Sequence, residues 1–312
     1  MLKPFHLFLG VLTAFLWGLN FVFIQIGLAE VPPLLLSCLR FFFTAVPLVF
    51  FLRWPAVADS DSLAQTKRKP VPFRKIAAYS FLMFFCQFTL LFLGMQLGVS
   101  AGLSSIILQM QVFVTIALSV VLLHERLWKA QVLGALVAFG GIVLIGSAGS
   151  ISGEGVSIAG LGMVFLGAGA WGGANLVVCS LGRVHVLSLT VWSALLAVPL
   201  LAVMSLVMEG PETIVTTVQH MGWMAWTAVF YQTVFATLCG SVIWSGLLVR
   251  YPASMIAPLS LLVPVFGLSC ATLLLGEPLP LWKIGAAALV LLGLCINLFG
   301  ARLKRMPAED NS

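Results

Sequence analysis

The sequence predicts an all-α integral membrane protein with ten transmembrane helices, arranged as two inverted repeats of five helices each. The first observation behind this prediction is composition: of 312 residues, 61% are hydrophobic and only 8% are charged, whereas a soluble domain carries about 25% charged residues. The second is a series of apolar stretches of roughly 20 residues, the length that crosses a hydrocarbon core of about 30 Å. The third is a set of motifs that recurs in the second half of the chain. A water-soluble globular protein is excluded, because its surface would be too apolar.

The apolar runs are continuous instead of alternating, which favours helices over membrane-spanning strands. The expected spans are residues 7–27, 33–53, 75–97, 100–123, 130–147, 157–179, 186–208, 222–248, 252–275 and 281–300. Lys3 and His6 are the only polar residues before the first span. Its apolar run is longer than that of a signal peptide and no small-residue cleavage site follows it, so we expect a retained helix.

The basic residues predict the orientation, since short loops rich in Lys and Arg stay in the cytoplasm. With ten spans and a cytoplasmic N-terminus, every Lys and Arg except Lys283 and Arg40 lies on the cytoplasmic side. The C-terminal tail, residues 301–312, is then also cytoplasmic. The net charge of +6 follows from this orientation and gives no indication of nucleic-acid binding.

One long loop and the cysteines complete this outline. The loop from Trp54 to Arg74 is polar and carries Lys67-Arg68-Lys69, so we expect a mobile topological anchor near anionic lipid. The six cysteines all lie inside apolar spans without a close pair. No disulfide framework and no zinc site is predicted.

An internal repeat divides the chain into residues 1–147 and 157–300. The sequence around Glu125, Leu-Leu-His-Glu-Arg-Leu, resembles Leu-Leu-Gly-Glu-Pro-Leu around Glu277, 152 residues further on. Ala-Val-Pro-Leu recurs at the same offset, and the segment Trp17–Asn20 has a looser copy at Trp171–Asn175. Because five is odd, the second copy must enter the bilayer from the opposite face, an arrangement typical of transporters. The alternative is that duplication built only a stable helix bundle.

Arg40 is the most informative residue, because a charge inside the membrane costs at least about 2.5–3.5 kcal/mol. It lies about seven residues below the outer end of its helix, and no Asp or Glu occurs in the interior of any span. Its guanidinium must bind backbone carbonyls, amide side chains, water or an anionic ligand, and its planar fork fits a carboxylate. Two interpretations stay open, namely a structural tie between helix ends and a ligand-binding role.

Other polar or aromatic residues fall at comparable depth. The amides are Asn20, Gln87, Gln109 and Gln111, which should point into the bundle because lipid cannot satisfy them. Gln109 and Gln111 cannot share one helical face, so one could line a cavity while the other holds a neighbouring helix. Hydrogen bonding between helices is the alternative role for each amide.

Aromatic and proline-rich positions extend this candidate site. Trp17 and Trp171 lie too deep for the interfacial belt, and Trp192 occupies the position in the second repeat that matches Arg40. Pro258 and Pro264 bracket Ser260 in the ninth span, where broken backbone is tolerated beside a cavity. The candidate binding residues are therefore Trp17, Asn20, Arg40, Gln87, Gln109, Gln111, Trp171, Trp192 and Ser260.

The sequence contains no nucleotide-binding loop and no catalytic constellation, since its four histidines sit at span ends without acidic or cysteine partners. We expect no enzyme, no catalytic residue, no metal and no cofactor. The expected partners are a small-molecule substrate and the lipid bilayer, with no nucleic acid, and the chain is expected to be a monomer or homodimer.

Several motifs resemble the EamA family of the drug/metabolite transporter superfamily. They are Trp17-Gly18-Leu19-Asn20, Pro32-Pro33, Leu39-Arg40-Phe41 and Glu125-Arg126-Leu127. Further stretches are similar to the members of this family that export cysteine and O-acetylserine. These stretches are Ala101-Gly102-Leu103, Leu108-Gln109-Met110-Gln111, the segment 191–195 and the segment 257–265.

The resemblance implies a multi-pass exporter of small metabolites in the bacterial inner membrane, with a central cavity between two five-helix repeats. It also implies amino acids or derivatives such as cysteine and O-acetylserine as substrates. The alternatives are a broader drug/metabolite exporter and a passive channel. Pro278 departs from the family pattern, and the loop from Asp59 to Arg74 is longer than usual.

Overall fold

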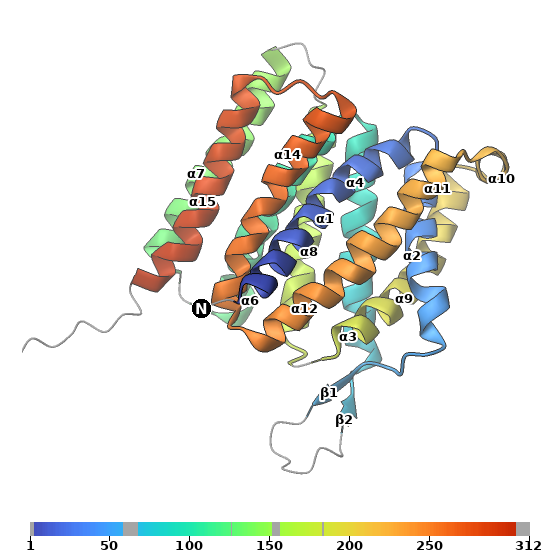
Figure 1. The fold of residues 1–312 in the computed structure, drawn as a ribbon, viewed down its shortest axis with the longest axis horizontal. Coiled ribbons are helices and arrows are strands. Elements are labelled where there is room, and N and C mark those ends of the chain that lie inside the picture. The colour runs from blue at the N-terminus through green and yellow to red at the C-terminus, as the bar shows by residue number, and fades with distance from the viewer. Residues whose placement is uncertain (1–2, 59–67, 126, 152–156, 183, 304–312) are drawn as a thin grey trace, which may run out of the picture.

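The structure, a computed structural model, describes residues 3–58, 68–125, 127–151, 157–182 and 184–303. The described part is almost entirely helical, with one small two-stranded sheet at one end (Figure 1). Within it, nine helices are long and apolar enough to cross a membrane. The prediction of an all-α membrane protein is therefore confirmed, whereas the cytoplasmic position of the termini stays a prediction.

Five of the long helices are continuous: α1 (Pro4–Leu28), α7 (Lys129–Ile151), α8 (Ile158–Cys179), α9 (Val186–Met208) and α15 (Leu281–Leu303). The others combine two or three helical segments. They are α3–η1–α4 (Phe73–Tyr79, Ser80–Cys86, Gln87–Gln96), α5–η2–α6 (Ala101–Ile107, Leu108–Met110, Gln111–Leu123), α11–η3–α12 (Trp223–Phe230, Tyr231–Cys239, Gly240–Arg250) and α13–η4–α14 (Ala253–Ile256, Ala257–Leu261, Leu262–Leu275). Residues 301–303 of the expected tail belong to α15, and residues 304–312 lie outside the described residues.

The second expected span is shorter than predicted. Its helix, α2, covers Pro33–Val49, which is 17 residues, and the chain turns directly after it. Pro47 lies in the last turn of this helix, where a proline weakens helical continuation because it lacks an N–H group. At about 1.5 Å per residue the helix is roughly 26 Å long, so the count of ten crossings remains a prediction.

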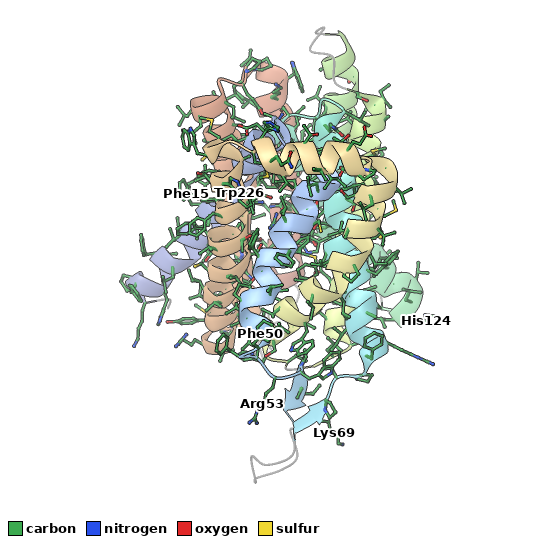
Figure 2. All side chains as sticks on the ribbon, turned by 90° about the vertical axis from the view of Figure 1, so that its right-hand side faces the viewer. Phe15, Phe50, Arg53, Lys69, His124 and Trp226 are labelled. Carbon is green, nitrogen blue, oxygen red and sulfur yellow. The ribbon has the colours of Figure 1, made fainter. Side chains whose placement is uncertain are left out.

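Two features were not predicted from the sequence. A short helix, α10 (Pro211–His220), has no buried residue and lies across one end of the bundle (Figure 2). The other feature is a pair of π-helical segments: η1 lies in the α3–η1–α4 helix, and η3 lies at the matching place of the second half, in the α11–η3–α12 helix. π-Helical segments are rare in proteins, and those that occur are often found at functional sites.

The loop expected to be a mobile anchor is structured at both ends. Strand β1 (Ala56–Ala58) pairs antiparallel with β2 (Arg68–Pro70), and Val57 forms a further bridge to Val184. Apolar side chains, including Val71 and Leu181, pack beneath this hairpin, so burial holds its base in place. Residues 59–67, including Lys67, lie outside the described residues.

The helices pair between the two halves of the chain in a regular way. Helix α2 packs along α9, and α7 packs along α15. In addition, α1 packs on α14 as α8 packs on α6, and α1 packs on the α11–η3–α12 helix as α8 packs on the η1–α4 segment. Each contact therefore has a counterpart in which the halves exchange roles, which is the packing expected of two related repeats.

Candidate functional site

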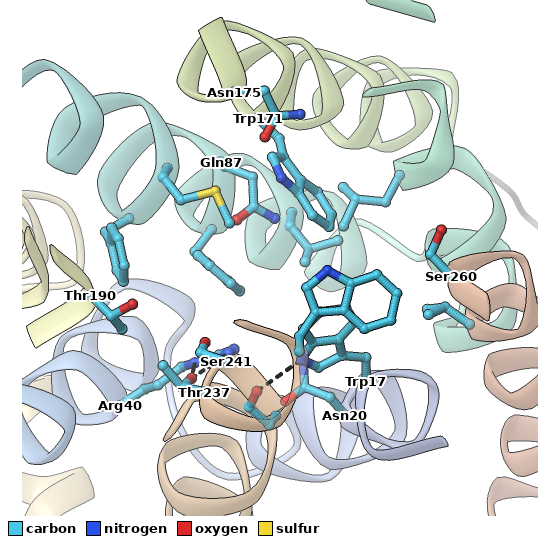
Figure 3. Close-up of a pocket in the computed structure, with 18 of the residues that line it drawn as sticks. Trp17, Asn20, Arg40, Gln87, Trp171, Asn175, Thr190, Thr237, Ser241 and Ser260 are labelled. Carbon is cyan, nitrogen blue, oxygen red and sulfur yellow. Dashed lines mark hydrogen bonds between the residues drawn. The ribbon is translucent and has the colours of Figure 1, made fainter. Parts of the chain in front are cut away.

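A cavity of about 400 Å³ lies between the two halves of the bundle (Figure 3). Its volume is within the range of small-molecule sites. The polar and tryptophan side chains that line it are Trp17, Asn20, Arg40, Tyr79, Gln87, Ser105, Gln109, Trp171, Asn175, Thr190, Thr237, Ser241, Trp244, Ser245 and Ser260. Apolar residues such as Val186 and Leu248 extend the lining toward one end of the bundle.

Arg40 lies on one wall of this cavity and is only 4% exposed. Its Nε and Nη2 donate to the hydroxyl of Thr237 at 3.2 and 2.9 Å, and Nη1 donates to the amide oxygen of Gln232 at 3.5 Å. The guanidinium carbon also lies 4.2 Å from the ring centre of Phe88, a favourable cation–π arrangement. Both hydrogen-bond partners belong to η3, so the π-helical segment positions the guanidinium.

These bonds do not satisfy the whole guanidinium. A guanidinium has five N–H donors, and the three bonds to Thr237 and Gln232 leave two of them without a partner among the described residues. Among the described residues, no carboxylate lies within ion-pair distance of the Arg40 guanidinium, and none of its hydrogen bonds goes to Asp or Glu. Arg40 can therefore still accept an anionic group from the cavity.

Two buried amide oxygens in the same cavity have no hydrogen-bond donor among the described residues. They are Oδ1 of Asn20 and Oε1 of Gln87, whose residues are 7% and 1% exposed. A buried acceptor without a partner is costly. Figure 3 shows Gln87 on the opposite side of the cavity from Arg40 and Thr237. The cavity thus offers unused acceptors as well as unused donors to a ligand.

The two neighbouring glutamines take different positions. Gln109 lines the cavity, and its Nε2 donates to the Ser260 carbonyl at 3.1 Å. The amide oxygen of Gln111 instead accepts from Asn175 Nδ2 at 2.7 Å, which ties η2–α6 to α8, and Gln111 does not belong to the lining. Ser260 lies in the 3-10 segment η4, and its hydroxyl donates to the Ala257 carbonyl.

The tryptophans divide in the same way. Trp17 and Trp171 line the cavity, and the Trp17 indole donates to the Ala236 carbonyl at 3.0 Å. Trp192 does not line it: its indole donates to the carbonyls of Leu52 and Arg53, at the base of the hairpin. Trp192 and Arg40 are equivalent positions of the two repeats, so each lies about two turns from the start of its own helix. Helices α2 and α9 start at opposite ends of the bundle, and the two side chains therefore lie in different places.

We expect Trp192→Phe to leave ligand affinity unchanged, because the indole N–H bonds, among the described residues, only to the hairpin base. The substitution should lower the melting temperature slightly, since one hydrogen bond contributes about 1 kcal/mol. The dissociation constant of a ligand bound in the cavity and the melting temperature in detergent test both statements. A raised dissociation constant with an unchanged melting temperature would return Trp192 to the binding site.

Sequence reasoning missed several polar residues of the site, among them Asn175, Thr237 and Ser241 in the lining and Gln232, which bonds to Arg40. Asn175 ends the repeated tryptophan motif, so the repeat itself could have indicated it. The other three lie in the expected span 222–248, where polar residues at membrane depth were the available signal. Gln232 and Thr237 reach Arg40 from the π-helical segment η3, which no sequence pattern predicted.

Among the described residues, no group of three or more His, Cys, Asp and Glu side chains could hold a metal ion. A bundle of apolar helices with a polar cavity between two related halves defines a membrane transport protein. The sequence pattern of the EamA-like transporter family matches residues 4–147 and again residues 158–299, and the chain belongs to this family.

Several relatives extend this assignment. The chain is 36% identical over 302 residues to a "Probable amino-acid metabolite efflux pump" of Salmonella typhimurium, covering 96% of each chain. A protein of the same name from Escherichia coli is 37% identical over 302 residues, covering 95% of this chain and 96% of the relative. A solved crystal structure with 18% identity matches with a TM-score of 0.62 over 97% of this chain and all of the other, which supports the fold alone.

Proposed function

We propose that this protein exports amino acids or their derivatives, such as cysteine and O-acetylserine, across the bacterial inner membrane. The proposal rests on one observation: the same cavity contains N–H groups of Arg40 without a described partner and amide oxygens of Asn20 and Gln87 without a described partner. The names of the relatives from Salmonella typhimurium and Escherichia coli support amino-acid metabolites as the substrate class and a bacterial membrane as the location.

The chemistry of the cavity fits a zwitterion. A carboxylate can bind the remaining N–H groups of Arg40 through charge-assisted hydrogen bonds. An ammonium group, which has three donors and no acceptor, fits the oxygens of Asn20 and Gln87. Apolar residues such as Phe88 and Leu108 also line the cavity, and they can contact the short side chain of an amino acid. A cationic, aromatic drug would meet Arg40 as a like charge, so we favour amino acids over a broad drug exporter.

Alternating access between two inverted five-helix repeats, residues 1–147 and 157–300, is the mechanism we propose. The lining continues to Val186 and Leu248, the ends of helices near Arg183 and Arg250. In the orientation that the basic residues favour, this is the cytoplasmic end. The structure would then represent the state that loads substrate from the cytoplasm.

The energy source we propose is the substrate gradient. All ten acidic residues of the chain lie outside the interiors of the expected spans, so a proton-coupling carboxylate of the usual kind has no place in mid-membrane. Facilitated efflux should therefore proceed at a rate that does not depend on an imposed pH gradient.

Counterflow in proteoliposomes tests the proposal. Vesicles loaded with unlabelled O-acetylserine should accumulate labelled O-acetylserine or cysteine saturably. Unlabelled cysteine should compete, whereas cysteamine, which lacks the carboxylate, and 3-mercaptopropionate, which lacks the ammonium group, should compete at least about tenfold less well. Non-saturable flux would favour a channel, and competition by cationic drugs alone would favour a broad drug exporter.

We expect Gln87→Leu to raise the half-saturation constant for amino-acid counterflow about tenfold, since it removes an acceptor for the ammonium group. The protein should remain folded, because the Oε1 atom of Gln87 has no partner within the described protein. Gln96→Leu is the matched control, an exposed glutamine in the last turn of the same α4 helix. Equal half-saturation constants in both variants would remove Gln87 from the site.

A further inference from the structure

The two ends of the proposed transport pathway, which runs through the central cavity, are packed differently. The repeats would predict that the two ends correspond. At one end, every residue of α5 is buried, and α5 packs on both α1 and α14. The matching segment of the second repeat begins at Ala253, and its η4 part has no buried residue. In the described chain, neither α13 nor η4 makes comparable contact with α6 or α8. The pathway is thus closed at the α5 end and open at the other.

The carboxylate of Glu277 bonds to the start of α5 at the closed end. Oε1 of Glu277, directly after α14, accepts from the backbone N–H of Ala101 at 2.9 Å, and Oε2 accepts from that of Gly102 at 3.3 Å. These N–H groups belong to the first turn of a helix, where no intrahelical acceptor exists and the helix dipole favours an anion. We call this pair of bonds the Glu277 latch.

The helices beneath the Glu277 latch approach closely. A Cβ atom at Gly18 would stand 2.6 Å from Cβ of Phe266, and one at Gly102 would stand 2.9 Å from a methyl group of Leu268. A second cavity of about 390 Å³, whose wall includes Gln25, Ser100 and Glu277, lies on this side. Because Glu277 and Ser100 belong to its wall, the Glu277 latch borders this second cavity.

The first repeat carries the same groups at the open end. Glu125 corresponds to Glu277, and Ala253 corresponds to Ala101, each at an offset of 152 residues. Glu125 is exposed. His124, which precedes it, lies at the end of the molecule that carries Arg53 and Lys69, opposite α10 (Figure 2). The left-handed backbone of His124, with φ of 56°, matches that of Gly276 before Glu277, with φ of 67°.

We propose that Glu277 and Glu125 are alternating gate latches, an inference that rests on the transport function proposed above. In the present state Glu277 closes the exit. When the repeats exchange conformations, the Glu277 latch breaks and Glu125 binds the backbone at the start of α13, closing the opposite end. Glu209 forms a similar pair of bonds with the first N–H groups of α2, but α2 packs along α9 without an open counterpart, so we assign Glu209 no such role.

Hydrogen–deuterium exchange of the full-length protein, without substrate, tests the latches. Glu277→Gln should make amides in residues 99–105 exchange roughly tenfold faster, because a charged acceptor is lost. At the same time, residues 119–125 and 251–261 should exchange more slowly, since the opposite end closes. Glu212→Gln, at an exposed glutamate of α10, is the matched control and should change neither region.

The reciprocal change separates a gate from local fraying. Faster exchange near Ala101 without slower exchange near Ala253 would overturn the proposal, as would no change in either region. Adding Glu125→Gln to Glu277→Gln should abolish the protection gained at residues 119–125 and 251–261. Glu125→Gln alone, at an exposed position, should keep the present exchange pattern but slow counterflow several-fold, and unaltered counterflow would contradict the role of Glu125. Because exchange needs no substrate, its failure is distinguishable from failure of the amino-acid proposal.

Discussion

Arg40→Gln should reduce saturable amino-acid counterflow about a hundredfold at low substrate concentration. The expected loss corresponds to about 3 kcal/mol, the contribution of a charge-assisted, bidentate contact with a carboxylate. Glutamine retains a hydrogen-bond donor for Thr237 but not the charge, and it lacks the planar fork of five donors. The measurement is the initial rate of labelled O-acetylserine accumulation in proteoliposomes across a range of substrate concentrations.

Two further variants make this experiment decisive. Arg40→Lys keeps a charge but loses the fork, so it should retain an intermediate rate. Arg53→Gln is the matched control, because Arg53 is an exposed arginine outside the cavity, at the end that carries the hairpin (Figure 2). If Arg40→Gln protein is folded and transports with an unchanged half-saturation constant, Arg40 only ties α2 to η3 through Thr237 and Gln232.

Gly293→Leu should destabilise the protein by at least about 3 kcal/mol, the upper range for overpacking. A Cβ atom at this position would stand 2.8 Å from both Cβ and N of Ala138, and it would also meet the carbonyl of Gly134. Helices α7 and α15 pack along one another, so their backbones would have to separate. Small residues permit this close approach in a membrane, where packing drives helix association.

Thermal unfolding in detergent, followed by circular dichroism, measures this effect. Gly140→Leu is the matched control, because a Cβ atom at Gly140 of α7 would meet no described residue within 4 Å, and its melting temperature should stay close to that of the unmodified protein. If both variants melt at the same temperature, α7 and α15 do not associate in the membrane protein as they do in this structure.

Sequence alone predicted the helices well because lipid imposes a strong rule. A backbone in hydrocarbon must satisfy its own hydrogen bonds, so a long apolar run is a helix. The predicted span 186–208 coincides with α9, and 157–179 nearly coincides with α8. The boundary of α2 was less accurate because Pro47 and the following turn end the helix early. The hairpin base was missed because Val57 pairs with residues distant in sequence, Lys69 and Val184.

The candidate site was predictable only in part. Depth in the membrane selected Arg40, Asn20 and Gln87, and the structure places all three around one cavity. Depth could not distinguish a side chain that faces the cavity from one that faces a neighbouring helix, as Gln109 and Gln111 show. Nor could it reveal Gln232, whose bond to Arg40 joins positions 192 residues apart.

Hydropathy and repeated motifs are local properties of the chain, and they were enough to identify a membrane protein of the EamA-like transporter family with a repeated half. Which polar groups stay unpaired depends instead on how the helices pack. Arg40 meets Thr237 through a π-helical turn, and Glu277 reaches the start of α5 across the bundle. Such contacts depend on how distant helices pack, and the free energy of an unpaired buried group depends on those neighbours.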